Sequence, residues 1–127
     1  MASIMIVEDE PDIAELYRLF LESESHQIVG IYSDPIEALA QVGLRGYPDL
    51  VILDERLGAR SGSSYLRSFR EIFRGSRLLL VSADNEAVER AEELGFDEAK
   101  RKPVTLRHLL ENISGLLSRP ARSAKPR

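Results

Sequence analysis

The chain has 127 residues, of which 43% are hydrophobic and 30% charged, and its formal net charge is −4. This length supports one domain with one sizeable hydrophobic core and is too short for a second. The sequence has no cysteine, which excludes a disulfide framework and a thiolate metal site. It also has no stretch near the roughly 20 apolar residues of a membrane span and no signal-peptide pattern, so we expect a cytoplasmic protein.

The first two predicted elements are a strand and a helix. Ile4–Val7 is a short apolar run that ends directly on the acids Glu8 and Asp9. Pro11 suits the first turn of a helix, and apolar residues recur after it at helical spacing as far as Leu21. We therefore expect a strand whose carboxyl end carries carboxylates, followed by an amphipathic helix of three to four turns.

The next predicted elements lead to the most informative run of the chain. Ile28–Tyr32 is a weaker strand, and Asp34 begins a helix over Ile36–Leu44. Leu50–Leu53 is uniformly apolar and too short for an isolated helix, which is typical of a strand covered on both faces. This strand ends abruptly on Asp54. In open α/β sheets, ligands bind at that edge.

The remaining part repeats the same alternation of strands and helices. Each strand is again followed by a polar residue, Ser82 after the first and Lys102 after the second. The last predicted strand is mostly charged. The predicted elements are a helix over about Ser64–Arg74, a strand over Leu78–Val81, a helix over Asn85–Leu94, a strand near Ala99–Arg101 and a helix over Leu106–Leu117.

Five strand-then-helix units predict an α/β fold. Short connections and right-handed crossovers give a doubly wound parallel sheet with helices on both faces, and we expect the flavodoxin-like (βα)5 strand order 2-1-3-4-5. The polar residues that follow the strands then meet at one edge of the sheet. They are Glu8, Asp9, Asp54, Ser82 and Lys102.

Three carboxylates at one edge of a sheet repel one another. Either one of them takes up a proton through a raised pKa, or a divalent cation neutralises them, and oxygen ligands without His or Cys suit Mg²⁺ or another hard cation such as Mn²⁺. A cation beside a carboxylate, a hydroxyl and a lysine is suited to phosphoryl transfer. The sequence lacks the competing phosphate motifs GxxxxGK[ST] and GxGxxG.

Four motifs together resemble a known family. The run Ile6–Pro11, Asp54 with Gly62 eight residues later, the pair Ser82-Ala83 and the pair Lys102-Pro103 are similar in order and spacing to the receiver domain of two-component response regulators. The resemblance covers residues 4 to 117. It implies a regulatory phospho-acceptor, not an enzyme, that takes a phosphoryl group from a sensor histidine kinase and assists only its own phosphorylation and dephosphorylation.

The resemblance also implies the role of each site residue. Asp54 would be the phospho-acceptor, and Asp9 and Asp54 would ligate Mg²⁺ or Mn²⁺. Glu8 would help through water, and the backbone carbonyl of Arg56 would complete the protein ligands. Ser82 would hydrogen-bond a phosphoryl oxygen, and Lys102 would pair with that oxygen and precede a cis peptide bond to Pro103.

Several positions depart from the family pattern. Gly58 stands where the family usually has proline, so we expect a more mobile loop after Asp54. Ala99 replaces the usual aromatic switch residue, which weakens any relay from Ser82 through a rotating ring. Lys100 and Arg101 make the fifth strand basic.

Two other functions are weighed against a phosphorylated switch. The first is a pseudo-receiver, an interaction module that keeps the fold and does not rely on phosphorylation; the intact set of acids, serine and lysine argues against it. The second is a haloacid-dehalogenase-like phosphatase, which needs an acid two residues after its nucleophile, where this chain has Arg56. His26 and His108 are expected at the surface, away from Asp54.

The expected domain organisation is a receiver domain over residues 1–118 and a flexible basic tail over residues 119–127. About ten residues after the last helix are too few for a DNA-binding module, so we expect a single-domain regulator that acts by protein contact and not by binding nucleic acid. The expected partners are a kinase and, through the face formed by residues 85–118, a downstream regulator or a second copy.

A last expectation concerns the lifetime of the phosphoryl group. In the family, the residues two positions after the acceptor and two after the serine flank the route of water to the phosphorus. Here these are Arg56 and Asp84. We expect them to form an ion pair that partly shields the site.

Overall fold

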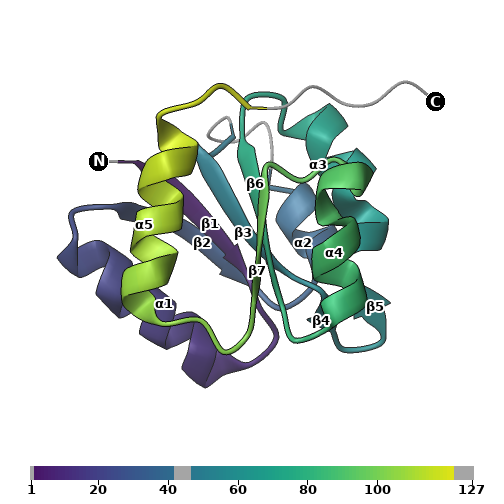
Figure 1. The fold of residues 1–127 in the computed structure, drawn as a ribbon. Helices are drawn as coiled ribbons and strands as arrows, with labels where there is room; N and C mark the ends of the chain where they lie inside the picture. The colour runs from purple at the N-terminus through teal and green to yellow at the C-terminus, as the bar shows by residue number, and fades with distance from the viewer. Residues whose placement is uncertain (1, 42–46, 122–127) are drawn as a thin grey trace.

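The computed structural model describes residues 2–41 and 47–121, and it forms an α/β fold around one parallel sheet (Figure 1). The sheet has five strands in the order β2-β1-β3-β6-β7. Leaving out the two short strands β4 and β5, this is the predicted order 2-1-3-4-5. The five strands are β1 Ser3–Val7, β2 Gln27–Tyr32, β3 Leu50–Asp54, β6 Arg77–Ser82 and β7 Glu98–Arg101.

The central strand β3 is buried along its whole length, as its uniformly apolar sequence predicts. Its side chains alternate between two hydrophobic clusters, with Leu50 and Ile52 on one face of the sheet and Val51 and Leu53 on the other. The charged strand β7 pairs with β6, as expected from its sequence position. Because β7 lies at the edge of the sheet, it tolerates charged side chains that a central strand would not.

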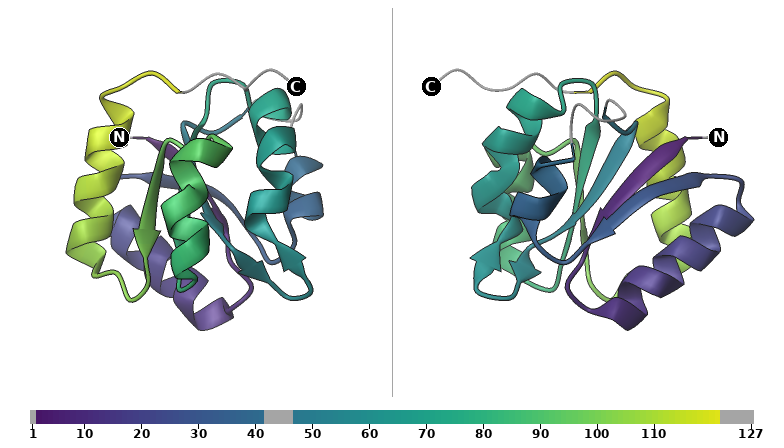
Figure 2. Two further views of the ribbon diagram at one scale, coloured as in Figure 1. Left: turned by 45° about the vertical axis from the view of Figure 1, so that its right-hand side comes forward. Right: turned by 180° about the vertical axis from the view of Figure 1, so that it is seen from behind.

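Helices cover both faces of the sheet (Figure 2). On one face lie α1 Pro11–Ser23 and α5 Leu106–Leu117, and on the other lie α2 Pro35–Leu39, α3 Leu66–Ile72 and α4 Asn85–Leu94. Within the described ranges, none of the helices is long and apolar enough to cross a membrane.

Three local predictions differ from the structure. The helix predicted over Ile36–Leu44 is α2, which ends at Leu39, and residues 42–44 lie outside the described part of the chain. The helix predicted over Ser64–Arg74 is split, because the Ser61 side chain accepts the Ser64 N–H and fixes a 3-10 turn over Gly62–Tyr65 before α3. A short hairpin of β4 Arg56–Leu57 and β5 Arg60–Ser61 was not expected.

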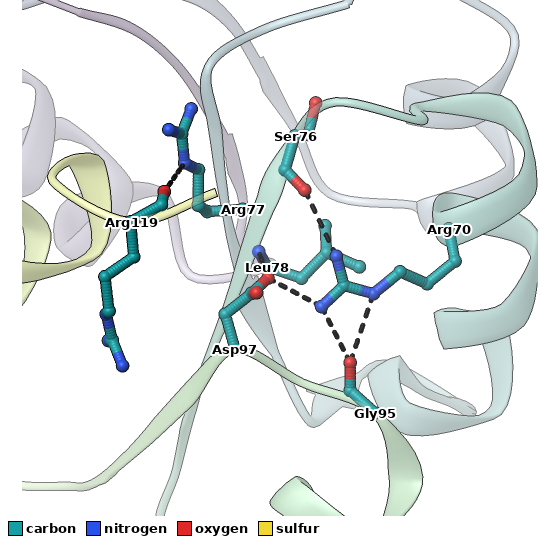
Figure 3. A network of polar contacts seen from close by, with 7 residues as sticks. All are labelled: Arg70, Ser76, Arg77, Leu78, Gly95, Asp97 and Arg119. Atoms are coloured by element: carbon teal, nitrogen blue, oxygen red, sulfur yellow. Dashed lines mark hydrogen bonds and ion pairs between the residues drawn. The ribbon is translucent and has the colours of Figure 1, made fainter. Parts of the chain in front are cut away.

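A buried ion pair joins the helices of one face to the sheet (Figure 3). Arg70 of α3 lies 2.6 Å from Asp97, and each side chain is only 4% exposed. Arg70 also donates to the carbonyls of Gly95 and Ser76, and Asp97 accepts the backbone N–H of Leu78. The network thereby fastens the carboxyl end of α4, where Gly95 is the cap, to α3 and β6.

Candidate functional site

The carboxyl ends of the strands bring the predicted polar residues together. Glu8 and Asp9 follow β1, Asp54 ends β3 and Ser82 ends β6. Parallel pairing sets these ends side by side, since Val7 pairs with Leu53 and Asp54 pairs with Val81. The structure therefore places residues from distant parts of the chain at a single edge, as in other open α/β sheets.

Three carboxylates form the centre of the site. Oxygen atoms of Glu8, Asp9 and Asp54 all lie within 4.8 Å of one another, and Glu8 and Asp54 are buried. The donor set consists of carboxylate oxygens, without nitrogen or sulfur. Hard divalent cations such as Mg²⁺ prefer such ligands, so the residues present fit a magnesium ion.

Lys102 lies against two of these carboxylates. Its Nζ is 3.1 Å from Oε1 of Glu8 and 3.1 Å from Oδ2 of Asp54. Burial disfavours the charged form of the lysine, but the attraction of Asp54 and Glu8 exceeds this effect, so the pKa of Lys102 is raised. The lysine therefore stays charged and partly balances the acidic cluster.

Glu8 is the carboxylate most perturbed by its surroundings. Burial raises the pKa of Glu8 to about 7, the neighbouring Asp54 carboxylate adds to the increase, and Lys102 opposes it. Without a bound cation, Glu8 therefore takes up a proton at a higher pH than an ordinary glutamate does.

Backbone contacts orient the other polar groups of the site. Oδ2 of Asp9 accepts the N–H of Gly58 at 3.0 Å, and Oγ of Ser82 accepts the N–H of Asp84 at 2.9 Å. Ser82 is buried, and the Asp84 N–H is the local partner of its hydroxyl. Lys102-Pro103 is a cis peptide bond, as the resemblance implied.

Two glycines explain the close approach of the loop after Asp54. A Cβ atom on Gly62 would lie 2.0 Å from the carbonyl oxygen of Asp54, so only glycine fits there. Gly58 has φ +65°, which favours glycine, and its N–H reaches Asp9. The contact of Gly58 with the site was missed from the sequence, where its only signal was a glycine in the loop.

The prediction of an ion pair between Arg56 and Asp84 was wrong. Among the residues that the structure describes, no ion pair joins these two side chains. Oδ1 of Asp84 instead accepts the N–H groups of Glu86 and Ala87 and caps α4. The first-turn amides of α4 thus provide a local partner for this carboxylate.

Arg56 and the two histidines lie outside the cluster of acids. Arg56 is exposed at the start of β4, two residues after Asp54, and the role of its carbonyl as a metal ligand stays a prediction. His108 is exposed on α5, as expected. His26 is partly buried and accepts the N–H of Ala2 through Nδ1, at the opposite end of β1 from Glu8.

Comparison with known proteins agrees with this geometry. The family model of the response regulator receiver domain matches residues 4–114. The chain belongs to this family. Receiver domains are phosphorylated by sensor histidine kinases, and the family supports a regulatory, phospho-accepting role in two-component signalling.

Individual relatives share this domain. The transcriptional regulatory protein TrcR of Mycobacterium tuberculosis is 30% identical over 125 residues, which are 97% of this chain and 48% of TrcR. The chain spans about half the length of the curated relatives it matches.

Solved structures of receiver domains have the same fold. A receiver domain protein from Methanospirillum hungatei is 26% identical with a TM-score of 0.82, and the similarity covers 93% of this chain and 94% of that one. The response regulator TrrA of Thermotoga maritima, solved in complex with Mg²⁺ and BeF, is 28% identical with a TM-score of 0.79, and covers 91% of this chain and 99% of its own.

Proposed function

We propose that this receiver domain accepts a phosphoryl group on Asp54 from the phosphohistidine of a sensor histidine kinase. The observation that carries the proposal is the setting of the Asp54 carboxylate, which ends the central strand among two further acids. A lysine ammonium lies 3.1 Å from its Oδ2. A pseudo-receiver that does not rely on phosphorylation would have no need of this combination of charges.

In the proposed transfer, a carboxylate oxygen of Asp54 attacks the phosphorus. An O–P bond forms while the P–N bond to the donor histidine breaks, and the imidazole nitrogen keeps the electron pair of that bond and takes up a proton from the solvent. Lys102 balances negative charge on a phosphoryl oxygen, and the Ser82 hydroxyl donates a hydrogen bond to it. Such groups favour the transition state by position and charge.

The acidic cluster is the proposed cation site. Glu8, Asp9 and Asp54, with the carbonyl of Arg56, would hold Mg²⁺ or Mn²⁺. When bound, the cation would supply positive charge that offsets the negative charge of the phosphoryl group. TrrA, which was solved with Mg²⁺ and BeF, supports this assignment by its similarity.

Ser82 connects the site to α4. Its Oγ accepts the N–H of Asp84, and Asp84 caps the first turn of α4. A Ser82 hydroxyl drawn toward a phosphoryl group gives up this contact with Asp84. Phosphorylation would therefore loosen the amino end of α4, although the chain has Ala99 where an aromatic relay is usual.

The proposed output is a protein contact through the face formed by residues 85–118. On this face, α4 carries Glu86, Glu89, Glu92 and Glu93, and the adjacent β7 carries Lys100 and Arg101. A face with both signs of charge suits a downstream regulator or a second copy. We assign residues 1–118 to the receiver domain and residues 119–127 to a basic tail, of which residues 122–127 lie outside the described part.

Beryllofluoride, a phosphoryl mimic, tests the proposal. We expect ¹⁹F NMR to show bound beryllofluoride with the wild type in the presence of Mg²⁺ and none with Asp54→Asn. Glu37→Gln, which changes an exposed carboxylate of α2, is the matched control and should behave as the wild type. Absence of a bound signal in the wild type would leave the pseudo-receiver as the function.

A further inference from the structure

The hairpin formed by β4 and β5 directly follows Asp54. Arg56 pairs with Ser61 and Leu57 pairs with Arg60, so Gly58 and Ala59 form a two-residue turn. Gly58, the first of the two, has φ +65°, as a type II′ hairpin turn requires. The loop after Asp54 therefore contains a hairpin with a defined turn at Gly58.

The hairpin is anchored at both strands. Leu57 is buried in the hydrophobic cluster under α3. Nη1 of Arg60 donates to the Tyr65 hydroxyl at 2.9 Å, and Nε of Arg60 lies 3.5 Å from Oδ1 of Asp34, which caps α2. These contacts define where the turn lies relative to the sheet.

The turn contacts the acidic cluster at one carboxylate. The Gly58 N–H donates to Oδ2 of Asp9 at 3.0 Å, across 49 residues of sequence. Asp9 lies between the end of β1 and the start of α1, outside any regular element. The Gly58 N–H, held by an anchored hairpin, restricts the rotation of the Asp9 carboxylate. The same contact therefore also limits the direction in which Oδ1, the second oxygen of Asp9, can point.

We propose that the β4–β5 hairpin is a positioning element for the cation site, which acts through the Gly58 amide on Asp9. The proposal rests on the proposed function, since it assumes that Asp9 ligates the cation. Groups that hydrogen-bond a metal-ligating side chain hold it in place for the ion, and their loss typically weakens metal affinity about 10- to 100-fold. Gly58 is a positioning residue, because it reaches the cation only through Asp9.

The test measures Mg²⁺ affinity by calorimetry, together with unfolding by urea in EDTA. Gly58→Pro removes the N–H and cannot adopt φ +65°, so we expect Mg²⁺ to bind about tenfold or more weakly. Gly58→Asn keeps the N–H and tolerates positive φ, so it should restore most of the affinity. A hairpin with a merely structural role would lower stability in EDTA in Gly58→Pro and leave the Mg²⁺ affinity unchanged.

A second pair of variants keeps the proposal testable if Gly58→Pro fails to fold. Arg60→Ala releases the hairpin from Tyr65 and Asp34 while Gly58 and Asp9 stay in place, and it should weaken Mg²⁺ binding in the same direction. Arg67→Ala, which removes an exposed arginine of α3, is the control and should not. Equal affinity in Arg60→Ala and Arg67→Ala would then overturn the proposal.

The wild type separates this inference from the proposed function. If the wild type and Asp9→Asn bind Mg²⁺ equally or not at all, the proposed cation site is wrong, and the hairpin proposal is overturned with it. If the wild type binds Mg²⁺ through Asp9 and Gly58→Pro binds it equally well, the hairpin proposal alone is wrong.

Discussion

Nζ of Lys102 lies 3.1 Å from Oδ2 of Asp54 and 3.1 Å from Oε1 of Glu8, so one ammonium group joins two buried carboxylates. Without a cation, this contact offsets much of the repulsion within the acidic cluster. Removing the ammonium leaves the two carboxylates facing each other, a costly arrangement that Glu8 relieves in part by taking up a proton.

Lys102→Met should therefore destabilise the metal-free domain. We expect a loss of about 2 kcal/mol, below the usual cost of breaking a fully buried pair because Lys102 is partly exposed. Added Mg²⁺ should recover more stability in this variant than in the wild type. Urea unfolding at pH 8 with EDTA or Mg²⁺ measures both effects. Lys100→Met on β7 is the control, and an equal loss in both variants would contradict the prediction.

The stability of the metal-free domain should depend on pH through Glu8. Because the pKa of Glu8 rises from 4.5 to about 7 on folding, the folded chain binds more protons than the unfolded chain between these values. The resulting stabilisation is fully present below pH 4.5 and is lost as the pH rises through 7.

Glu8→Gln should remove this contribution. We expect the wild type to lose stability relative to Glu8→Gln as the pH rises from about 4.5 to 7. Urea unfolding of both proteins in EDTA measures this difference in unfolding free energy. Mg²⁺ should stabilise the wild type most above pH 7, where Glu8 is charged. A difference that is constant over this range would show that Glu8 has an ordinary pKa.

Arg70 should be the most important charged residue for stability away from the site. Its guanidinium donates to Gly95, Ser76 and Asp97, and replacing it with methionine leaves Asp97 with a buried charge and a lost partner. We expect a loss of about 3–5 kcal/mol for Arg70→Met, against under about 1 kcal/mol for Arg67→Met on the exposed side of the same helix. Urea midpoints at constant m-value test this. Similar losses in the two variants would be inconsistent with a buried pair.

Ser82 should control the exchange of the amides at the start of α4. Ser82→Ala removes the acceptor of the Asp84 N–H, so hydrogen exchange at residues 84–87 should be faster before any activation. Beryllofluoride with Mg²⁺ should raise exchange there in the wild type and in Ser82→Thr, and change it little in Ser82→Ala. Equal responses in all three proteins would break the proposed link between Ser82 and α4.

The architecture could be predicted because its strands are distinct in the sequence. The run Leu50–Leu53 is too apolar for an exposed strand and too short for a helix, and the regular alternation of strands and helices predicts a doubly wound parallel sheet. Once the strands are parallel, Glu8, Asp54 and Ser82 must meet at one edge. Even the charged strand β7 was located, since Lys102-Pro103 marks its end.

What could not be predicted depends on short-range choices of individual side chains. The Asp84 carboxylate could either pair with Arg56 or cap α4. Residue spacing does not show whether a carboxylate will contact a cation that is distant in sequence or the backbone amides next to it. The hairpin after Asp54 has strands of two residues, which are too short for a periodic pattern. The hairpin and its contact from Gly58 to Asp9 could therefore not be predicted from the sequence. The raised pKa of Glu8 depends first on burial, which a sequence does not give by residue.

The central claim is that Asp54 is the phospho-acceptor, and intact-mass spectrometry tests it most directly. The wild type and Asp54→Asn are incubated with acetyl phosphate and either Mg²⁺ or EDTA. The account predicts that the wild type gains the mass of one phosphoryl group with Mg²⁺ and not with EDTA, and that Asp54→Asn gains none. The same mass gain in Asp54→Asn, or none in the wild type with Mg²⁺, would contradict it.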